Sequence, residues 1–426
     1  MNPSTSGKKT RPVSEYLPIL GFALVLCYFM YGVAIRELTG ELSDYSGHVY
    51  VYIATFTGES ALKGWMMSPY FLWHAVVLFF KTVLKLPVEN SAAAASCVFY
   101  LASYFITVFM TEKWCSHNEL RIPVTLTGFF SFALTMIQPI WISFLDAGAS
   151  RSVGVFSFNP LYSPTHMAAR PFALLCFMLV IDLWELSQSR GSFFFGLSRI
   201  KALVVLSVTL FISAAAKPVF AEMFIPAVGI MMLFECIFSF VKNKESGKTY
   251  LKEFLLPAFC AAIPAIVFIF AMFFLFINMG GSYTDTEGVV ITPFLQVWSI
   301  YSENIPLSML FMMSFPIYIL IIDSKNFLRS VAGKLGIISF VTGFLEAAFL
   351  GEGGDKLGHG NFIWPMMFGI LLLWASAMLH FLTMEKKTSA RFARFLICLG
   401  WILILIHVHY GFQYLFEVFG WDFMIF

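Results

Sequence analysis

The sequence predicts an all-α polytopic membrane protein, and its composition is the first evidence for this. Hydrophobic residues fill 59% of the 426 positions, charged residues fill only 12%, and the mean hydropathy is +0.80. A soluble domain has roughly 45–50% apolar and about 25% charged residues. Because so few charges could not cover a water-facing surface, we exclude a cytosolic enzyme and a disordered scaffold. A net charge of only +2 also argues against a nucleic-acid partner.

The second observation is a series of long apolar runs. A helix needs about 20 mainly apolar residues to cross the hydrocarbon core of a bilayer. The first run has no small-residue cleavage site after it, so we expect an uncleaved anchor rather than a signal peptide. One integral membrane domain, residues 1–426, is expected to contain eleven spanning helices, at 16–35, 92–112, 122–142, 168–187, 200–216, 219–240, 254–278, 306–323, 335–349, 362–384 and 393–415.

The apolar run 70–86 is expected to lie outside this set. On a helix its residues His74, Lys81 and Lys85 would share one face. A helix with one cationic and one apolar face lies in the membrane interface or lines a polar cavity. We therefore expect the first outer segment, 36–91, to include an interfacial helix.

The third observation is the placement of the basic residues, which orients the chain. Most of the 27 Lys and Arg lie in the N-terminal tail and in alternate loops after it. Since cytoplasmic loops carry the excess of Lys and Arg, we expect a multi-pass protein of the cell membrane with a cytoplasmic N-terminus. If 70–86 spanned the membrane, the N-terminus would lie outside instead. The opposite, outer face would carry most of the candidate catalytic and binding residues. They lie in the segments 36–69, 143–167, 279–305 and 350–361.

The first outer segment holds Asp44 and His48, four positions apart, which places them on one face of a helix. An Asp at a membrane surface can act as a general base, with the His orienting it or the substrate. The alternative interpretation is structural, with Ser43 or Asp44 as a helix N-cap.

The second outer segment holds further candidates for substrate binding: Arg151, Asn159, His166 and Arg170. Pro160 and Pro164 predict an extended turn before residue 165, because proline disfavours a helical conformation in the residue before it. Arg170 would then lie at the mouth of the next helix. There it could bind an anion such as phosphate through its planar guanidinium. Alternatively, its side chain could snorkel to the membrane–water interface without binding a ligand.

Lys217 and Glu222 interrupt a stretch that is otherwise apolar. An ionisable residue among membrane helices is a candidate functional residue, and Lys217 would lie at the outer turn between two spans. A Lys–Glu pair that only neutralises itself is the alternative.

The last outer segment is the densest in polar groups. Five glycines between residues 351 and 360 would permit a close approach of the backbone to a ligand. No strand is expected before it, so it is neither a Walker loop nor a dinucleotide-binding turn. A solvated turn is the structural alternative to a binding role for its polar residues Glu352, Asp355, Lys356, His359 and Asn361.

The remaining patterns predict no metal or disulfide framework. Six of the seven cysteines lie in apolar runs, and none forms a CxxC pair or a close cluster. The third outer segment is expected to be a polar surface loop with a short interfacial helix around 294–301. No internal repeat is visible, which gives an inverted-repeat transporter no support from the sequence.

The layout of the N-terminal third resembles the GT-C superfamily of membrane glycosyltransferases. The resemblance rests on Asp44 in a long first outer loop, the helix from His48 to Tyr52 after it, and the non-spanning segment 70–86. A second acidic residue, which the family has beside the first or in a later loop, is not evident next to Asp44. The segments 159–170 and 358–364 also look like those of bacterial surface-polysaccharide assembly proteins.

The resemblance implies transfer of a sugar from a polyprenyl-phosphate-linked donor to a glycan, lipid or protein acceptor at the outer face, among membrane lipids. Asp44 would accept the proton of the acceptor hydroxyl. The phosphate would be neutralised by Arg170 and Lys217 with Arg151 or Lys356, while His48, His166, His359 and Asn361 would position the donor or acceptor. No cofactor is expected with certainty, and a divalent metal stays open. The alternatives are a surface-polysaccharide polymerase or ligase, and a non-enzymatic transporter of lipid-linked glycans.

Overall fold

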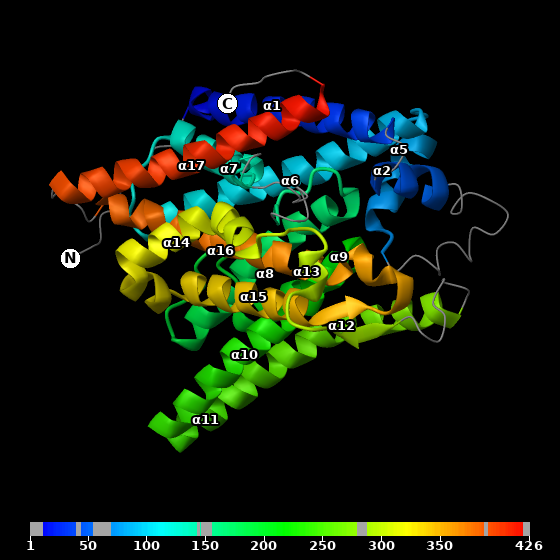
Figure 1. The fold of residues 1–426 in the computed structure, drawn as a ribbon. Helices are drawn as coiled ribbons and strands as arrows, with labels where there is room; N and C mark the ends of the chain where they lie inside the picture. The colour runs from blue at the N-terminus through cyan, green and yellow to red at the C-terminus, as the bar shows by residue number, and fades with distance from the viewer. Residues whose placement is uncertain are drawn as a thin grey trace.

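The computed structural model describes residues 12–39, 44–53, 70–142, 145, 156–278, 288–386 and 391–420. Figure 1 shows a bundle of long helices that run roughly parallel or antiparallel to one another. Within the described ranges the fold is all-α apart from two three-residue strands. The predicted fold class is therefore confirmed at the level of a helical bundle with many apolar helices.

Ten helices among the described residues are long and apolar enough to cross a membrane. Two of them, α8 and α16, have mostly buried side chains and lie inside the bundle, while α12 is largely exposed. Figure 1 shows α10, α11 and α12 projecting from the body of the bundle. The long helices are α1 (Leu17–Leu38), α6 (Val88–His117), α8 (Pro164–Ser187), α9 (Arg199–Ala216), α10 (Val219–Lys242), α12 (Leu256–Asn278, continuous with α11, Lys244–Tyr250, and η3, Leu251–Leu255), α14 (Ile305–Arg329), α15 (Val331–Phe349), α16 (Trp364–Lys386) and α17 (Arg391–Val418).

The sequence predicts eleven spanning helices, and ten are found among the described residues. The expected span 122–142 accounts for this difference. Its helix, α7 (Val124–Met136), has only 13 residues and is too short to cross a bilayer by itself. The chain continues from it as the non-helical segment 137–142. Pro139 lies soon after the end of α7, and proline disfavours a helical conformation in the preceding residue. Ile137, two residues before Pro139, is already non-helical, with φ −53° and ψ 126°.

The unwound chain after α7 is buried, so its backbone polar groups need partners inside the protein. The amide of Gln138 donates to the carbonyl of His407 in α17 over 3.2 Å. In return, Nδ1 of His407 lies 2.7 Å from the carbonyl oxygen of Gln138. The break in this helix is therefore held by specific contacts from a distant part of the chain.

The shorter elements gather at one end of the bundle, which we call the Asp44 end and which lies on the right in Figure 1. Val289 in β1 pairs antiparallel with Glu352 in β2, so the third and fourth expected outer segments adjoin. The expected short helix near 294–301 is present as α13. The elements of this end are α2 (Asp44–Ser46), η2 (Gly47–Ile53), the start of α5 (Leu72–Val83), β1 (Val289–Ile291), α13 (Gln296–Ser299), β2 (Leu350–Glu352), η4 (Gly354–His359) and η5 (Asn361–Ile363); η1 (Val13–Tyr16) precedes α1.

Candidate functional site

Asp44, His48 and His74 form a chain of contacts at the Asp44 end. Oδ1 of Asp44 lies 3.4 Å from Nε2 of His48, one helical turn later. The other ring nitrogen of His48, Nδ1, lies 3.1 Å from Nε2 of His74 in α5. Both histidines are buried, whereas the side chain of Asp44 is 37% exposed. The expected shared face of Asp44 and His48 is present, and the Asp44 side chain is partly exposed although its Oδ2 is buried.

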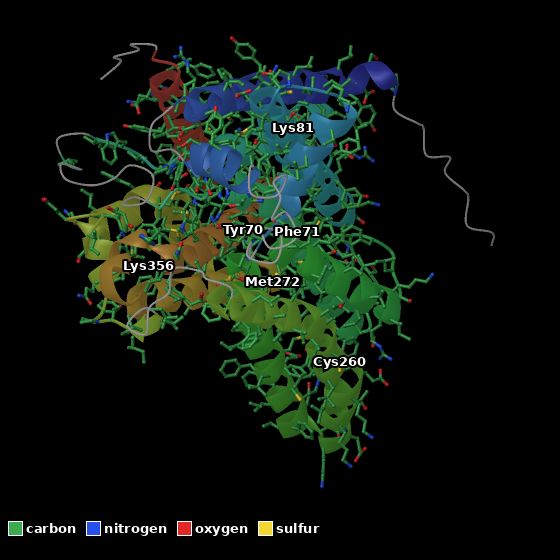
Figure 2. The ribbon with its side chains drawn as sticks, turned by 90° about the vertical axis from the view of Figure 1, so that its right-hand side faces the viewer. Tyr70, Phe71, Lys81, Cys260, Met272 and Lys356 are labelled. Atoms are coloured by element: carbon green, nitrogen blue, oxygen red, sulfur yellow. The ribbon has the colours of Figure 1, made fainter. Side chains whose placement is uncertain are left out.

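Helix α5 differs from the cationic-face helix that the sequence predicts. His74 is fully buried and turns toward His48, not toward the lipid headgroups. Lys85 lies beyond the helix end with φ +57°, so it does not share a helical face with Lys81. Figure 2, viewed from the Asp44 end, shows Lys81 far from Tyr70, which lies just before α5. The helix has 12 residues and is too short to span a membrane, as expected.

Lys217 reaches the same site from the turn between α9 and α10. Pro218 disfavours a helical conformation at Lys217, which is extended with φ −163° and ψ 121°. The Nζ of Lys217 donates to Oγ of Ser163 over 3.3 Å and lies 3.9 Å from the ring centroid of Trp364. Only 8% of Lys217 is exposed, so its charge is directed into the protein.

The charges of Asp44 and Lys217 affect each other. Burial alone would raise the pKa of Asp44, but the hydrogen bond and charge of His48, with help from Lys217 and Ser163, hold that pKa well below its usual range. Burial lowers the pKa of Lys217 to about 8, and the Asp44 carboxylate offsets part of this effect. Asp44 is therefore ionised at neutral pH, and Lys217 is a cation that can lose its proton just above neutral pH.

The start of α8 adds buried polar atoms next to Lys217. Ser163 immediately precedes the helix, whose free amide groups form the positive end of its dipole. The hydroxyls of Tyr162 and Thr165 and the Nδ1 of His166 are buried and, within the described part of the chain, have no hydrogen-bond partner. The ring of His166 stacks on Phe368, with centroids 4.0 Å apart. These atoms leave unused hydrogen-bonding capacity for a polar ligand beside the Asp44–Lys217 pair.

Asn159 and Arg170, two predicted substrate-binding residues, are engaged at the broken end of α7. The amide of Asn159 donates to the carbonyls of Ile137 over 2.6 Å and Leu134 over 3.3 Å. Arg170 is fully buried in α8, donates from Nη2 to the carbonyl of Leu134 over 2.9 Å, and lies over the ring of Phe158. A cation at this end of α7 is favoured by the helix dipole. The structure thus gives both residues a role in stabilising the break, which the sequence does not predict.

Glu222 lies in the first turn of α10 and does not pair with Lys217 among the described contacts. Its electrostatic neighbour is Glu346 of α15, a helix that packs against α10. The Lys–Glu pair considered from the sequence is therefore absent from the described part of the chain, and Lys217 has Asp44 as its counter-charge instead.

The last outer segment forms a second polar cluster. Nδ2 of Asn361 donates to Oε2 of the buried Glu352 over 2.9 Å, and Nδ1 of His359 lies 3.5 Å from the same oxygen. Lys356 lies at the Asp44 end (Figure 2). The side chain of Asp355 and the whole of Arg151 lie outside what the structure describes. Trp364 directly follows η5 (Asn361–Ile363), and its ring contacts Nζ of Lys217, so this cluster lies close to Lys217.

His74, Ser163 and Trp364 are the site residues that sequence reasoning missed. The sequence does contain a signal for Ser163, because a serine before a proline is a common start of a helix. The sequence singles out His74 only as part of an expected cationic face. No local pattern places His74 or Trp364 at the site, since each reaches it only through the packing of helices far apart in the chain.

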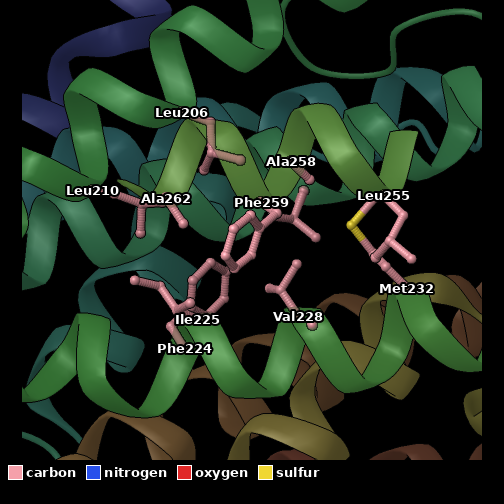
Figure 3. Close-up of a pocket in the computed structure, with 12 residues that line it drawn as sticks. Leu206, Leu210, Phe224, Ile225, Val228, Met232, Leu255, Ala258, Phe259 and Ala262 are labelled. Atoms are coloured by element: carbon pink, nitrogen blue, oxygen red, sulfur yellow. The ribbon is translucent and has the colours of Figure 1, made fainter. Parts of the chain in front are cut away.

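An apolar groove opens between the projecting helices and the body of the bundle (Figure 3). Along each helix its nearest lining residues, Leu210 and Phe224, are seven positions from Lys217, roughly 10 Å at 1.5 Å per residue. Its walls come from α8, α9, α10, η3 and α12, through Val180, Leu206, Leu210, Phe224, Ile225, Val228, Gly229, Met232, Leu255, Ala258, Phe259 and Ala262.

The described residues do not fit a divalent metal. Nowhere in them do three His, Cys, Asp or Glu side chains come together in an arrangement that could hold an ion. We therefore derive no chemical step through a metal. No known protein-family model matches the chain, and no curated protein is detectably similar to it in sequence.

Proposed function

We propose that the protein is a membrane glycosyltransferase that moves a sugar from a polyprenyl-phosphate-linked donor to a hydroxyl of a glycan, lipid or protein acceptor. The observation that carries the proposal is the meeting of Asp44, Lys217 and the start of α8 at one end of the bundle. A partly exposed carboxylate beside a buried cation suits a reaction in which one group accepts a proton and another stabilises a phosphate.

The phosphate of the donor is bound by Lys217 together with Ser163 and the amide groups at the start of α8. Lys217 is buried, so its attraction to a phosphate is screened less than that of a surface lysine. The free amides at a helix start bind phosphate oxygens in many proteins. The polyprenyl tail occupies the groove of Figure 3, whose lining is almost wholly apolar.

Asp44 is the general base, and binding of the donor makes it a better proton acceptor. In the free protein His48 and Lys217 hold its pKa low, which makes the carboxylate a weak proton acceptor. A phosphate bound to Lys217 weakens the effect of that lysine on Asp44, so the pKa of Asp44 rises. The acceptor oxygen then forms a bond to the anomeric carbon with inversion, its proton passes to Asp44, and the bond from that carbon to the phosphate oxygen breaks to release polyprenyl phosphate.

A transporter of lipid-linked glycans is the second candidate, and the break after α7 favours it. Interrupted helices are common at the binding sites of secondary transporters. The buried Arg170 at this break has two nitrogens, Nε and Nη1, with no hydrogen-bond partner among the described residues. A transporter would move the donor between leaflets without cleaving its sugar, and this distinguishes the two candidates.

The test uses the purified protein in liposomes that contain a radiolabelled polyprenyl-phosphate sugar and a mixture of glycan and lipid acceptors. Asp44→Asn keeps the shape of the side chain but cannot accept the proton, so we expect transfer to fall by about 10²–10⁴-fold, the range for loss of a general base. Full activity in Asp44→Asn would contradict the proposal, as would movement of uncleaved donor by the wild-type protein.

Binding gives an independent test of the phosphate site. Wild-type protein is expected to bind a long-chain polyprenyl phosphate more tightly than the matching polyprenol. Lys217→Met should remove about 10- to 100-fold of that preference, since hydrogen bonds to charged groups contribute about 1.5–3 kcal/mol. Binding of the polyprenol itself serves as the control and should be unchanged. Equal loss for both ligands would show that Lys217 maintains the fold and does not bind the phosphate.

A further inference from the structure

Trp364 connects the last outer segment to Lys217. It is the first residue of α16 and directly follows η5 (Asn361–Ile363). The side-chain amide of Asn361 donates to Oε2 of Glu352 over 2.9 Å, and Glu352 lies opposite Val289 in the β1–β2 pair. The segment that leads into Trp364 is therefore anchored before α16 begins, and this fixes where the indole ring starts from the backbone.

The ring of Trp364 faces the turn of Lys217 and the start of α8. The Nζ of Lys217 lies 3.9 Å from the ring centroid. The ring centroids of Tyr162 and His166 lie 5.9 Å and 5.2 Å from that of Trp364. A tryptophan of the membrane interface directs its ring to the level of the lipid headgroups. The contacts of Trp364 with three side chains from other elements instead indicate a role inside the protein.

The ammonium of Lys217 has few partners that could fix its position. A lysine ammonium carries three N–H donors, and among the described contacts one of them donates to Oγ of Ser163 over 3.3 Å. A cation over an aromatic face is attracted by the π-system, and tryptophan is the best of the aromatic residues for this contact. The attraction is larger where water is excluded, and Lys217 is buried. The ring therefore holds the ammonium from a second direction.

We propose that Trp364 is a positioning residue that holds the ammonium of Lys217 against the start of α8 through a cation–π contact. Ser163 and the ring then fix the ammonium from two sides, and a third N–H is directed at a phosphate oxygen of the ligand. Trp364 has no contact with the reacting atoms in this scheme. The use of the third N–H rests on the proposed function, but the contact between Trp364 and Lys217 does not.

The first test is NMR of the full-length protein with ε-¹³C-lysine, with the Lys217 signal assigned by its loss in Lys217→Met. Protons above an aromatic ring resonate upfield because of the ring current. We expect the ε-protons of Lys217 to lie upfield in the wild type and to lose this shift in Trp364→Met, which fills the space without a ring. Trp364→Phe should keep part of it. A wild-type signal without the shift, or a shift that persists in Trp364→Met, would overturn the proposal.

A pH titration of the same signal measures the stabilisation of the charged form. Loss of the ring should lower the midpoint of the Lys217 titration by about 0.4–1.5 pH units, which is the strength of a cation–π contact expressed as a shift. The titratable groups around the pair are Asp44 of α2 and Tyr162 and His166 at the start of α8, and the variants leave all three in place. A midpoint that does not fall in Trp364→Met would contradict the proposal.

Binding relates this inference to the proposed function. Trp364→Met should lower the preference for polyprenyl phosphate over polyprenol by about 2- to 30-fold, the same attraction expressed as affinity. Trp364→Phe should retain most of the preference. An unchanged preference in Trp364→Met, or an equal loss of binding for both ligands, would exclude a positioning role. A wild-type protein without any preference would contradict the proposed function, while the NMR shift would still test the contact.

The matched control is Trp184→Met. Trp184 lies near the other end of α8, and its ring centroid is 5.3 Å from Nζ of Lys334. This variant removes a similar contact at a distance from Lys217, so the Lys217 signal, its titration and the preference for the phosphate should all stay as in the wild type. Thermal unfolding of each variant checks that the protein is folded. A Lys217 signal that loses its shift in Trp184→Met would contradict the assignment to Trp364.

Discussion

At the scale of single residues, Lys217 shows how burial tunes a charge for binding. It is almost fully buried, and among the described residues the anion that stabilises its charged form is Asp44, which does so only in part. Its pKa of about 8 lies near the pH at which a phosphate ligand would bind. A surface lysine would stay charged to a much higher pH and would give a pH-independent site over this range.

The lowered pKa of Lys217 predicts a pH-dependent affinity for polyprenyl phosphate. Lys217 is a cation below pH 8 and becomes neutral above it, so affinity should fall as pH rises through about 8. The phosphate monoester is already a dianion there, since its second pKa is about 6. Above pH 8 the loss should approach about tenfold per pH unit. Equilibrium binding at several pH values between 7 and 9 would measure this change.

Two controls make that measurement specific. Polyprenol binding should be unchanged by pH, and Lys217→Arg should abolish the transition because guanidinium stays charged. The effect of Lys217 on folding has the opposite sign. Its pKa is lower in the folded than in the unfolded chain, so stability from this group increases between about pH 8 and its unfolded value. A loss of affinity together with loss of folded protein would contradict the assignment to Lys217.

Residue type predicted which residues lie together better than it predicted the contacts that each one makes. Asp44, His48 and Lys217 stand out in the sequence as polar groups beside apolar runs, and the structure brings them together. The same criterion also selects Asp182, which is fully buried in α8 and accepts hydrogen bonds from the backbone amides of 193–195. A lone ionisable residue in an apolar run thus indicates either chemistry or an internal anchor, and only its neighbours in space distinguish the two.

At the scale of elements, periodicity predicted most of the long helices but not the break in α7. The apolar run 122–142 continues through Ile137, Ile140 and Trp141, so hydrophobicity gives no sign that the helix stops. Pro139 is the one local signal. The partners that stabilise the break, Asn159 and His407, come from positions that no local pattern connects to α7.

The broken end of α7 also depends on a glycine in a neighbouring helix. Gly411 of α17 lies so close to the carbonyl of Met136 that an added Cβ would stand 1.9 Å from its oxygen. Backbone atoms cannot move aside as a flexible side chain can. Gly411→Ala should therefore destabilise the protein by about 1–3 kcal/mol, the usual cost of overpacking, and lower the temperature of thermal unfolding in detergent.

The matched control is Gly21→Ala in α1, where a Cβ would meet no atom within 4 Å. Alanine favours a helix by about 1 kcal/mol over glycine, so this variant should be as stable as the wild type or slightly more stable. Similar behaviour of the two variants would show that α17 does not approach the end of α7 as closely as described.

At the scale of the whole molecule, the distribution of charge predicted which segments lie together at the candidate site. The segments 36–69, 143–167, 279–305 and 350–361 were grouped from the positive-inside rule alone. Their described parts meet at one end of the bundle, through the contact of Lys217 with Ser163 and the pairing of β1 with β2. Alternation of sides along a chain of spanning helices is enough to predict this grouping, but the distances within the site follow from helix packing.

The orientation of the bundle leads to a prediction about the two sides of the membrane. Lys356 lies at the Asp44 end. Lys248 lies on α11, between the expected spans 219–240 and 254–278, in a lysine-rich segment that the positive-inside rule predicts to be cytoplasmic. A membrane-impermeant thiol reagent applied to intact cells should label Lys356→Cys, and should label Lys248→Cys only after permeabilisation. The exposed Cys260 and Cys398 are replaced first, because they would contribute background. Labelling of both positions from one side would contradict a bundle with these residues at opposite ends of its spanning helices. Labelling with the sides exchanged would keep the bundle but place the Asp44–Lys217 site in the cytoplasm.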